Sequence, residues 1–68
     1  MTITTDLYEE THEHKPRPSQ QALWMFLIER RPGEATNVQI NGAYRDALRE
    51  AKAEAKLIGG ANRIILLP

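Results

Sequence analysis

The sequence predicts a small α+β domain built from strand, strand, helix and strand, on three observations. Residues 22–28 form an uninterrupted apolar run of seven residues, which has the length of a buried strand. At 36–40, β-branched and amide side chains alternate, the pattern of a strand with one buried face. Residues 43–58 are rich in Ala, Leu, Glu, Lys and Arg, all good helix formers, and a short apolar run follows at 63–67.

The chain has 68 residues, no cysteine and a formal net charge of zero. We divide it into an acidic, proline-containing N-terminal arm at 1–20 and a single small domain at 21–68. Residues 1–14 carry four acids and no Lys or Arg, whereas residues 15–68 carry nine bases and five acids, so charges of −4 and +4 cancel. A domain this small buries only about 60% of the surface of its unfolded chain. Without cysteine, disulfides cannot compensate, and we expect association instead.

The arm is predicted to be either disordered or docked on the domain. Its sequence is polar and acidic, and Pro16 and Pro18 disfavour a helix around them. Ile3, Leu7 and Tyr8 are side chains that would favour docking, so both states stay open at this point.

The first strand is predicted at 22–30. Pro32-Gly33 follows it and suits the centre of a type II turn, since proline presets φ and glycine accepts a positive φ. A helix that begins at Ser19 as its N-cap is the alternative for this segment. The run is apolar on both faces, so we expect this strand in the middle of a sheet.

The second strand, the helix and the third strand are expected to form one crossover unit. Val38 and Ile40 share the buried face of the second strand at 36–40. Asn41 is expected to be the N-cap of the helix or the neighbour of that cap, because asparagine is favoured there. Gly59 and Gly60 end the helix, since glycine tolerates the left-handed conformation at a helix C-terminus. Residues 63–67 complete the sheet as its third strand.

Numbered along the chain, the three strands are expected in the spatial order 2-1-3, with the amphipathic helix packed on one face of the sheet. The other face then has no element packed on it. Strands with one solvated face normally alternate polar and apolar residues, and the first strand does not. The third strand also lies at an edge in this arrangement, where it is a candidate for pairing between chains. We expect the N-terminal arm, a second copy or a protein partner to cover the open face. To that face we assign Trp24, Phe26, Ile64 and Leu66, with the core as the alternative for Trp24 and Phe26.

The helix is predicted to carry two separate charged lines. The basic line contains Arg45, Arg49, Lys52 and Lys56, at spacings of four, three and four residues. The acidic line contains Asp46, Glu50 and Glu54. Arg30 and Arg31 add further positive charge to the domain. One interpretation is that the basic line meets phosphates or an acidic protein surface. The other is that two solvated ridges flank an amphipathic helix.

Catalytic and metal chemistry find little support in the sequence. His12 and His14 lie two residues apart on a segment expected to be a loop, whereas a metal site needs three or four converging ligands. Ser19 is the only serine, and Gly59-Gly60 follows a helix rather than preceding one, as a phosphate loop would. We therefore expect no catalytic residue, no metal, no cofactor and no small-molecule substrate. No apolar run is long enough to span a membrane, and a cytoplasmic location is expected.

The sequence thus predicts a small non-catalytic interaction or regulatory protein. It would bind a macromolecular partner through the basic helix line or the open sheet face. Inhibitors and accessory factors of phages and mobile elements are often of this size, which is an association by size alone. The alternative is a nucleic-acid-binding module that uses the basic line together with Arg30 and Arg31.

Overall fold

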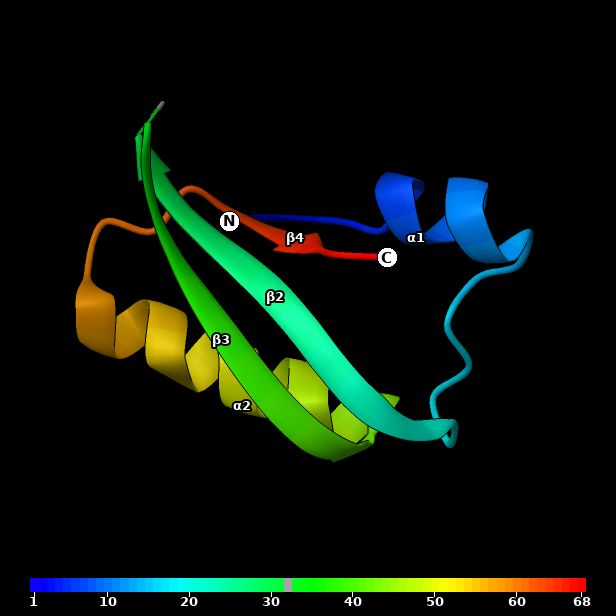
Figure 1. Ribbon diagram of the computed structural model, residues 1–68. Coiled ribbons are helices and arrows are strands. Elements are labelled where there is room, and N and C mark those ends of the chain that lie inside the picture. Colours follow the sequence, from blue (N-terminus) through cyan, green and yellow to red (C-terminus); the bar gives the residue numbers. More distant parts are fainter. Residues whose placement is uncertain (32) are drawn as a thin grey trace.

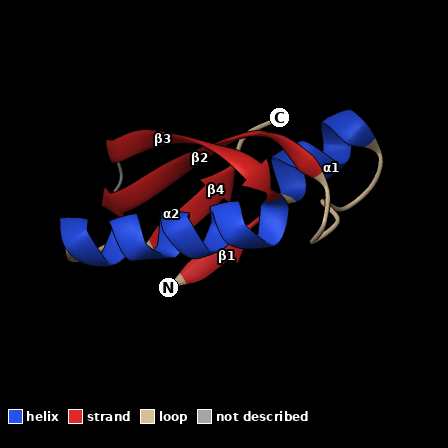
Figure 2. Cartoon of the chain, turned by 90° about the horizontal axis from the view of Figure 1, so that it is seen from below, coloured by secondary structure: helices blue, strands red, loops and turns tan. Residues whose placement is uncertain are grey.

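The computed structural model describes residues 1–31 and 33–68 and confirms the α+β class. The described residues form four strands and two helices: β1 (Thr2–Thr4), α1 (Asp6–His12), β2 (Gln21–Arg31), β3 (Glu34–Ala43), α2 (Tyr44–Ile58) and β4 (Arg63–Leu66). The strands make one mixed sheet in the order β1-β4-β2-β3. α2 packs along one face of it, and α1 lies at the end of the sheet where the chain terminates (Figures 1 and 2).

β2 and β3 form a long antiparallel hairpin that builds half of the sheet. Trp24 lies opposite Ile40, and Phe26 lies opposite Val38. The apolar run is therefore a strand, and the alternative of a helix from Ser19 is wrong. Of the predicted turn, Pro32 lies outside the described residues, and Gly33 has a φ of 86°, which glycine adopts without strain.

β4 lies inside the sheet, which corrects the prediction that it is an edge strand. It pairs antiparallel with β2 on one side and parallel with β1 on the other, where Ile3 lies opposite Ile64. The predicted count of three strands is wrong because residues 2–4 of the arm supply a fourth. A pattern of two threonines around one isoleucine is too short to mark a strand unless a partner strand is already in place.

The arm is docked on the domain, which is one of the two states that the sequence left open. α1 within it is a second helix where only one was predicted. Its Tyr8 ring is 5% exposed and belongs to the core. The side-chain amide of Gln20 donates to the hydroxyl oxygen of Tyr8 at 2.9 Å, which ties the start of α1 to the entrance of β2.

α2 begins directly after β3, with no side chain capping its first turn. The prediction that Asn41 is the N-cap or its neighbour is wrong, because Ala43 is the N-cap and Asn41 still pairs with Leu23 in the hairpin. Backbone carbonyls of the preceding loop take over the capping role. The Tyr44 and Arg45 amides donate to the carbonyls of Gln20 and Pro18, each at 3.0 Å. At the other end the helix stops at Gly59 as predicted, but this glycine has φ 75° and ψ 140°, which is not the left-handed helical conformation that was expected.

The core lies between α2 and the sheet. Its largest fully buried side chains are Phe26, Ile28, Ile64 and Leu66. On the helix side, the buried residues are Tyr44 and an alanine stripe formed by Ala47, Ala51 and Ala55. Small alanines let the helix backbone come close to the sheet, so that the large side chains of β2 and β4 fill the space between the layers.

Candidate interaction surfaces

The four apolar residues assigned to the open face from the sequence lie on the opposite face, beneath α2. Trp24, Phe26, Ile64 and Leu66 are all buried in the core. The assignment fails on register: Trp24 and Phe26 lie opposite Ile40 and Val38, whose side chains face the helix. Both faces of β2 carry large apolar side chains, so the sequence pattern alone does not distinguish the covered face from the open one.

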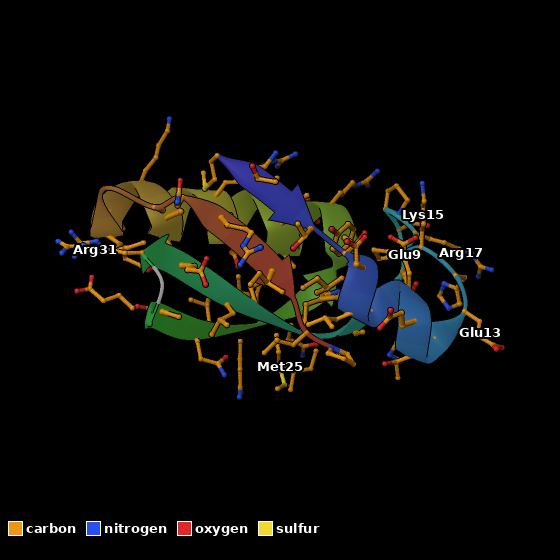
Figure 3. All side chains as sticks on the ribbon, turned by 90° about the horizontal axis from the view of Figure 1, so that it is seen from above. Glu9, Glu13, Lys15, Arg17, Met25 and Arg31 are labelled. Carbon is orange, nitrogen blue, oxygen red and sulfur yellow. The ribbon has the colours of Figure 1, made fainter. Side chains whose placement is uncertain are left out.

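The open face carries the other half of the same strands. Successive side chains of a strand point to opposite faces, so the open face receives the alternate apolar residues of β2 and β4. These are Leu23, Met25 and Leu27 of β2 and Ile65 of β4, and Leu67 directly after β4 joins them; all five are half-buried or exposed. Leu23 is 58% exposed. Figure 3 views the sheet from the side opposite to that of Figure 2 and labels Met25 on β2.

Polar but uncharged residues border this apolar centre. On β3 the amides of Asn37, Gln39 and Asn41 lie opposite Leu27, Met25 and Leu23. Toward the tip of the hairpin, Arg63 donates to a carboxylate oxygen of Glu29 at 3.0 Å and forms an ion pair with it. The open face therefore combines an apolar centre, an amide border and one internally neutralised ion pair.

A hollow of about 240 Å³ lies where α1 meets the open face. Its walls include Tyr8 and His12 of α1 and Leu23, Met25 and Leu67 of the sheet. The His12 ring stacks on Tyr8 with ring centroids 4.1 Å apart, which makes an aromatic wall at this end. The hollow continues the apolar surface of the open face toward α1, so an apolar side chain of a partner would fit there.

The predicted basic line is exposed along α2 in all four positions. Arg49 pairs with Asp46 at 3.8 Å, and both side chains are exposed, so this pair contributes little. Arg49, Lys52 and Lys56 line a shallow groove with Met1, on the side of α2 nearest β1. The acidic residues Glu50 and Glu54 lie on the other side of α2, next to β3. The structure thus separates Lys52 and Lys56 from Glu50 and Glu54, whereas the Arg49–Asp46 ion pair joins the two predicted lines.

Arg30 and Arg31 lie at the tip of the β2–β3 hairpin and not on the basic line. The guanidinium of Arg30 is next to Gly60, just beyond the end of α2. Arg31 pairs with Glu34 at 3.6 Å across the tip. The structure therefore brings together four of the six predicted basic residues and places the other two at one end of the line.

All four aromatic side chains of the chain belong to one buried cluster. The ring centroids of Trp24 and Tyr44 are 4.9 Å apart, those of Tyr8 and Trp24 are 5.7 Å apart, and those of Phe26 and Tyr44 are 6.4 Å apart. Burial raises the pKa of the Tyr44 hydroxyl. Single-strand readers stack bases on exposed aromatic rings, and none of these four rings is available for that purpose.

The described residues contain no group of three His, Cys, Asp or Glu side chains placed to hold a metal ion. The rings of His12 and His14 are 6.2 Å apart, and His12 is engaged with Tyr8. Across 1–31 and 33–68, none of the helices has the length and apolar character needed to cross a membrane. Comparisons with protein-family models, curated proteins and solved structures find no match to this chain.

Proposed function

We propose that this chain is a small, non-catalytic interaction protein that binds another protein surface through the open face of its sheet. The observation that carries the proposal is the apolar centre of that face, contributed by Leu23, Met25, Leu27, Ile65 and Leu67 on two neighbouring strands. A strand with one buried and one solvated face alternates apolar and polar side chains along its length. β3 follows this pattern, whereas β2 and β4 carry apolar side chains on both faces.

A second copy of the chain is the first occupant that we propose for this face. Two sheets pack face to face with their apolar side chains interdigitated, which needs no unpaired charge on either side. The open face meets that condition, because its Glu29 and Arg63 neutralise each other.

Light scattering over a concentration series tests this proposal. The wild-type chain should approach twice its 7.7 kDa mass as the concentration rises. Leu23→Glu should keep the mass of a single chain, because a carboxylate in the apolar centre would lose its hydration. Leu57→Glu is the matched control, since Leu57 is 81% exposed on α2 and lies outside the open face.

Affinity capture from an extract of the source cell supplies the second half of the test. If the partner is a different protein, the wild-type chain and the Leu57→Glu variant should both retain it, and Leu23→Glu should lose it. A single-chain mass at every concentration, together with no protein lost by Leu23→Glu, contradicts the proposal.

The basic line supports a second candidate function, the binding of a polyanion. Among the described residues, Arg45, Lys52 and Lys56 form no ion pair, so their charges are free to meet phosphates. Without exposed aromatic rings, such binding would rest on backbone phosphates and would be independent of base sequence.

Fluorescence anisotropy with labelled DNA at several salt concentrations tests this candidate. The logarithm of the binding constant should fall with the logarithm of salt concentration, by about 0.9 for each phosphate neutralised in double-stranded DNA. Lys52→Glu/Lys56→Glu should abolish binding, while Lys15→Glu/Arg17→Glu changes the net charge equally on the arm and should retain most of it. Equal losses of DNA binding in the two variants, or no measurable binding by the wild type, would contradict polyanion binding by the basic line.

A further inference from the structure

β3 forms an outer edge of the sheet along its ten residues. It pairs with β2 on one side only. In an antiparallel pair, every second residue directs its N–H and C=O toward the partner strand, and the residues between direct theirs away from it. Half of the backbone groups of β3 therefore point outward from the sheet, where the described residues place no further strand.

This edge lacks the features that usually protect sheet edges. Proteins commonly block an edge with a proline, a lysine, a bulge or a very short strand. β3 contains neither proline nor lysine, and its one charged residue is Glu34, at the tip of the hairpin. The irregularity in its pairing lies at the same end, between Glu29 and Arg31 of β2. The opposite edge, β1, is only three residues long.

A groove runs beside the free edge of β3, between the strand and α2. Its floor contains Val38 and Ile40, and Ala53 of the helix adds to its apolar part. Gln39 of β3 and the carboxylates of Glu50 and Glu54 complete the lining. An additional strand paired with β3 would place every second side chain over this groove.

The two carboxylates of the groove have a spacing that suits a strand. Glu50 and Glu54 are four residues apart on α2, which corresponds to a rise of about 6 Å. Side chains on the same face of a strand are two residues apart, which is about 6.8 Å. Glu50 and Glu54 form no ion pair among the described residues. Two basic side chains at positions i and i+2 of an added strand would therefore each find a carboxylate.

We propose that the free edge of β3 binds an extended peptide segment that adds a fifth strand to the sheet and carries Lys or Arg at alternate positions. Backbone hydrogen bonds to β3 supply affinity, and the contacts with Glu50 and Glu54 select the basic side chains. This site is separate from the open face, since it uses the outer edge of β3 and the helix side of the sheet.

A second copy is the wrong occupant for this edge. Two β3 edges paired around a two-fold axis would bring both α2 helices onto the same face of a continuous sheet. The acidic lines would then face each other across the interface, with Glu50 and Glu54 of each copy opposed. Like charges in that position repel, whereas a basic strand is attracted.

Two synthetic peptides test the proposal by NMR on the full-length ¹⁵N-labelled chain. One is a nine-residue peptide of alternating Thr and Lys, and the other has the same length with alternating Thr and Glu. The Thr-Lys peptide should slow the hydrogen exchange of every second amide of β3 at least tenfold, since those amides become hydrogen-bonded. The Thr-Glu peptide should leave the exchange unchanged.

Variants of the acidic line complete the test. Glu50→Lys/Glu54→Lys should lose the Thr-Lys peptide and gain the Thr-Glu peptide, and Glu50→Gln/Glu54→Gln should weaken the first without any gain of the second. Glu10→Lys/Glu13→Lys makes the same charge change on the exposed arm and should bind like the wild type. The proposal is overturned if the wild type binds both peptides equally, or if the protected amides lie outside β3. It is also overturned if the protection of β3 grows with the concentration of the chain alone, since that would show a second copy at the edge.

Discussion

The two faces of the sheet are built from the same strands and differ in what covers them. On one face, Trp24 and Phe26 of β2 are buried beneath the alanine stripe of α2. On the other face, Leu23 and Met25 of the same strand are exposed or half-buried, and they line an open hollow beside α1. The composition of β2 is apolar on both sides, so its burial is decided by the cover and not by the strand. This difference in cover is the reason for our proposal that a second copy or another protein packs on the open face.

The largest expected difference between the faces is the cost of removing a large side chain. Phe26→Ala should cost about 3–5 kcal/mol, because it opens a cavity beneath α2. Leu27 follows Phe26 along β2 and lies on the open face. Leu27→Ala should lower the unfolding free energy by about 1 kcal/mol, because Leu27 remains partly exposed to water in the folded chain. Urea unfolding followed by circular dichroism measures both values on the dilute chain.

A domain of this size has a total stability of roughly 3–5 kcal/mol, so Phe26→Ala should be largely unfolded. Similar costs for the two substitutions would show that the faces are equally covered in the isolated chain, which would remove the contrast.

The helix side of the covered face offers a second contrast, of intermediate size. Ala51 is buried against the sheet, and Ala53, two residues on, is exposed. Ala51→Leu should destabilise the domain by about 1–3 kcal/mol, because no space exists for the added atoms. Ala53→Leu should stay within about 0.5 kcal/mol of the wild type. Thermal unfolding of both variants gives the comparison, and tolerance of leucine at 51 would contradict close packing of the two layers.

The contact of the arm with the sheet predicts a smaller effect. Tyr8→Phe keeps the ring in the core and removes the oxygen that accepts from Gln20. We expect a loss of about 0.5–1.5 kcal/mol in unfolding free energy, the usual net value of one hydrogen bond. A double substitution with Gln20→Ala should cost little more than either single change, because the two residues share one interaction. Full additivity would mean that the arm docks without this bond.

The smallest effect is confined to alkaline pH. Burial raises the pKa of Tyr44 above the 10.0 of an exposed tyrosine, so the folded chain holds this proton more tightly than the unfolded chain. The contribution of this proton to the unfolding free energy is complete below pH 10 and is lost as the pH rises through the pKa of the folded state. The unfolding free energy of the wild type, measured between pH 8 and 11, should fall at the alkaline end. The unfolding free energy of the Tyr44→Phe variant should fall less over the same range. Identical profiles would place the Tyr44 hydroxyl in water.

The elements with strong local patterns could be predicted from the sequence. The apolar run of β2, the alternation in β3 and the alanine-rich stretch of α2 each satisfy one rule over many residues. β1 and α1 could not, because Thr2–Thr4 is a strand only beside β4 and Asp6–His12 is too short to be stable without Tyr8 in the core. Their structure is decided by tertiary contacts.

The charged lines of α2 could also be predicted, since helical spacing alone determines which residues share a side. Which face of β2 is open could not, because both faces are apolar and the choice depends on the register with β3 and on the fit to the helix. The predicted order 2-1-3 already placed β3 at an edge, where the structure also has it. The other edge was predicted wrongly, because β1 takes the place that β4 was expected to hold.

The most direct test of the open face is the solvent accessibility of the Met25 methyl group as the chain is concentrated or its partner is added. Relaxation of this methyl by a soluble paramagnetic probe, with a Leu57 methyl as reference, reports the two surfaces in one sample. We predict that the Met25 methyl loses contact with the probe when the face is covered, while Leu57 keeps it. A Met25 methyl that stays as accessible as Leu57, at every concentration and in the presence of every protein that the chain retains, would contradict an interface on this face.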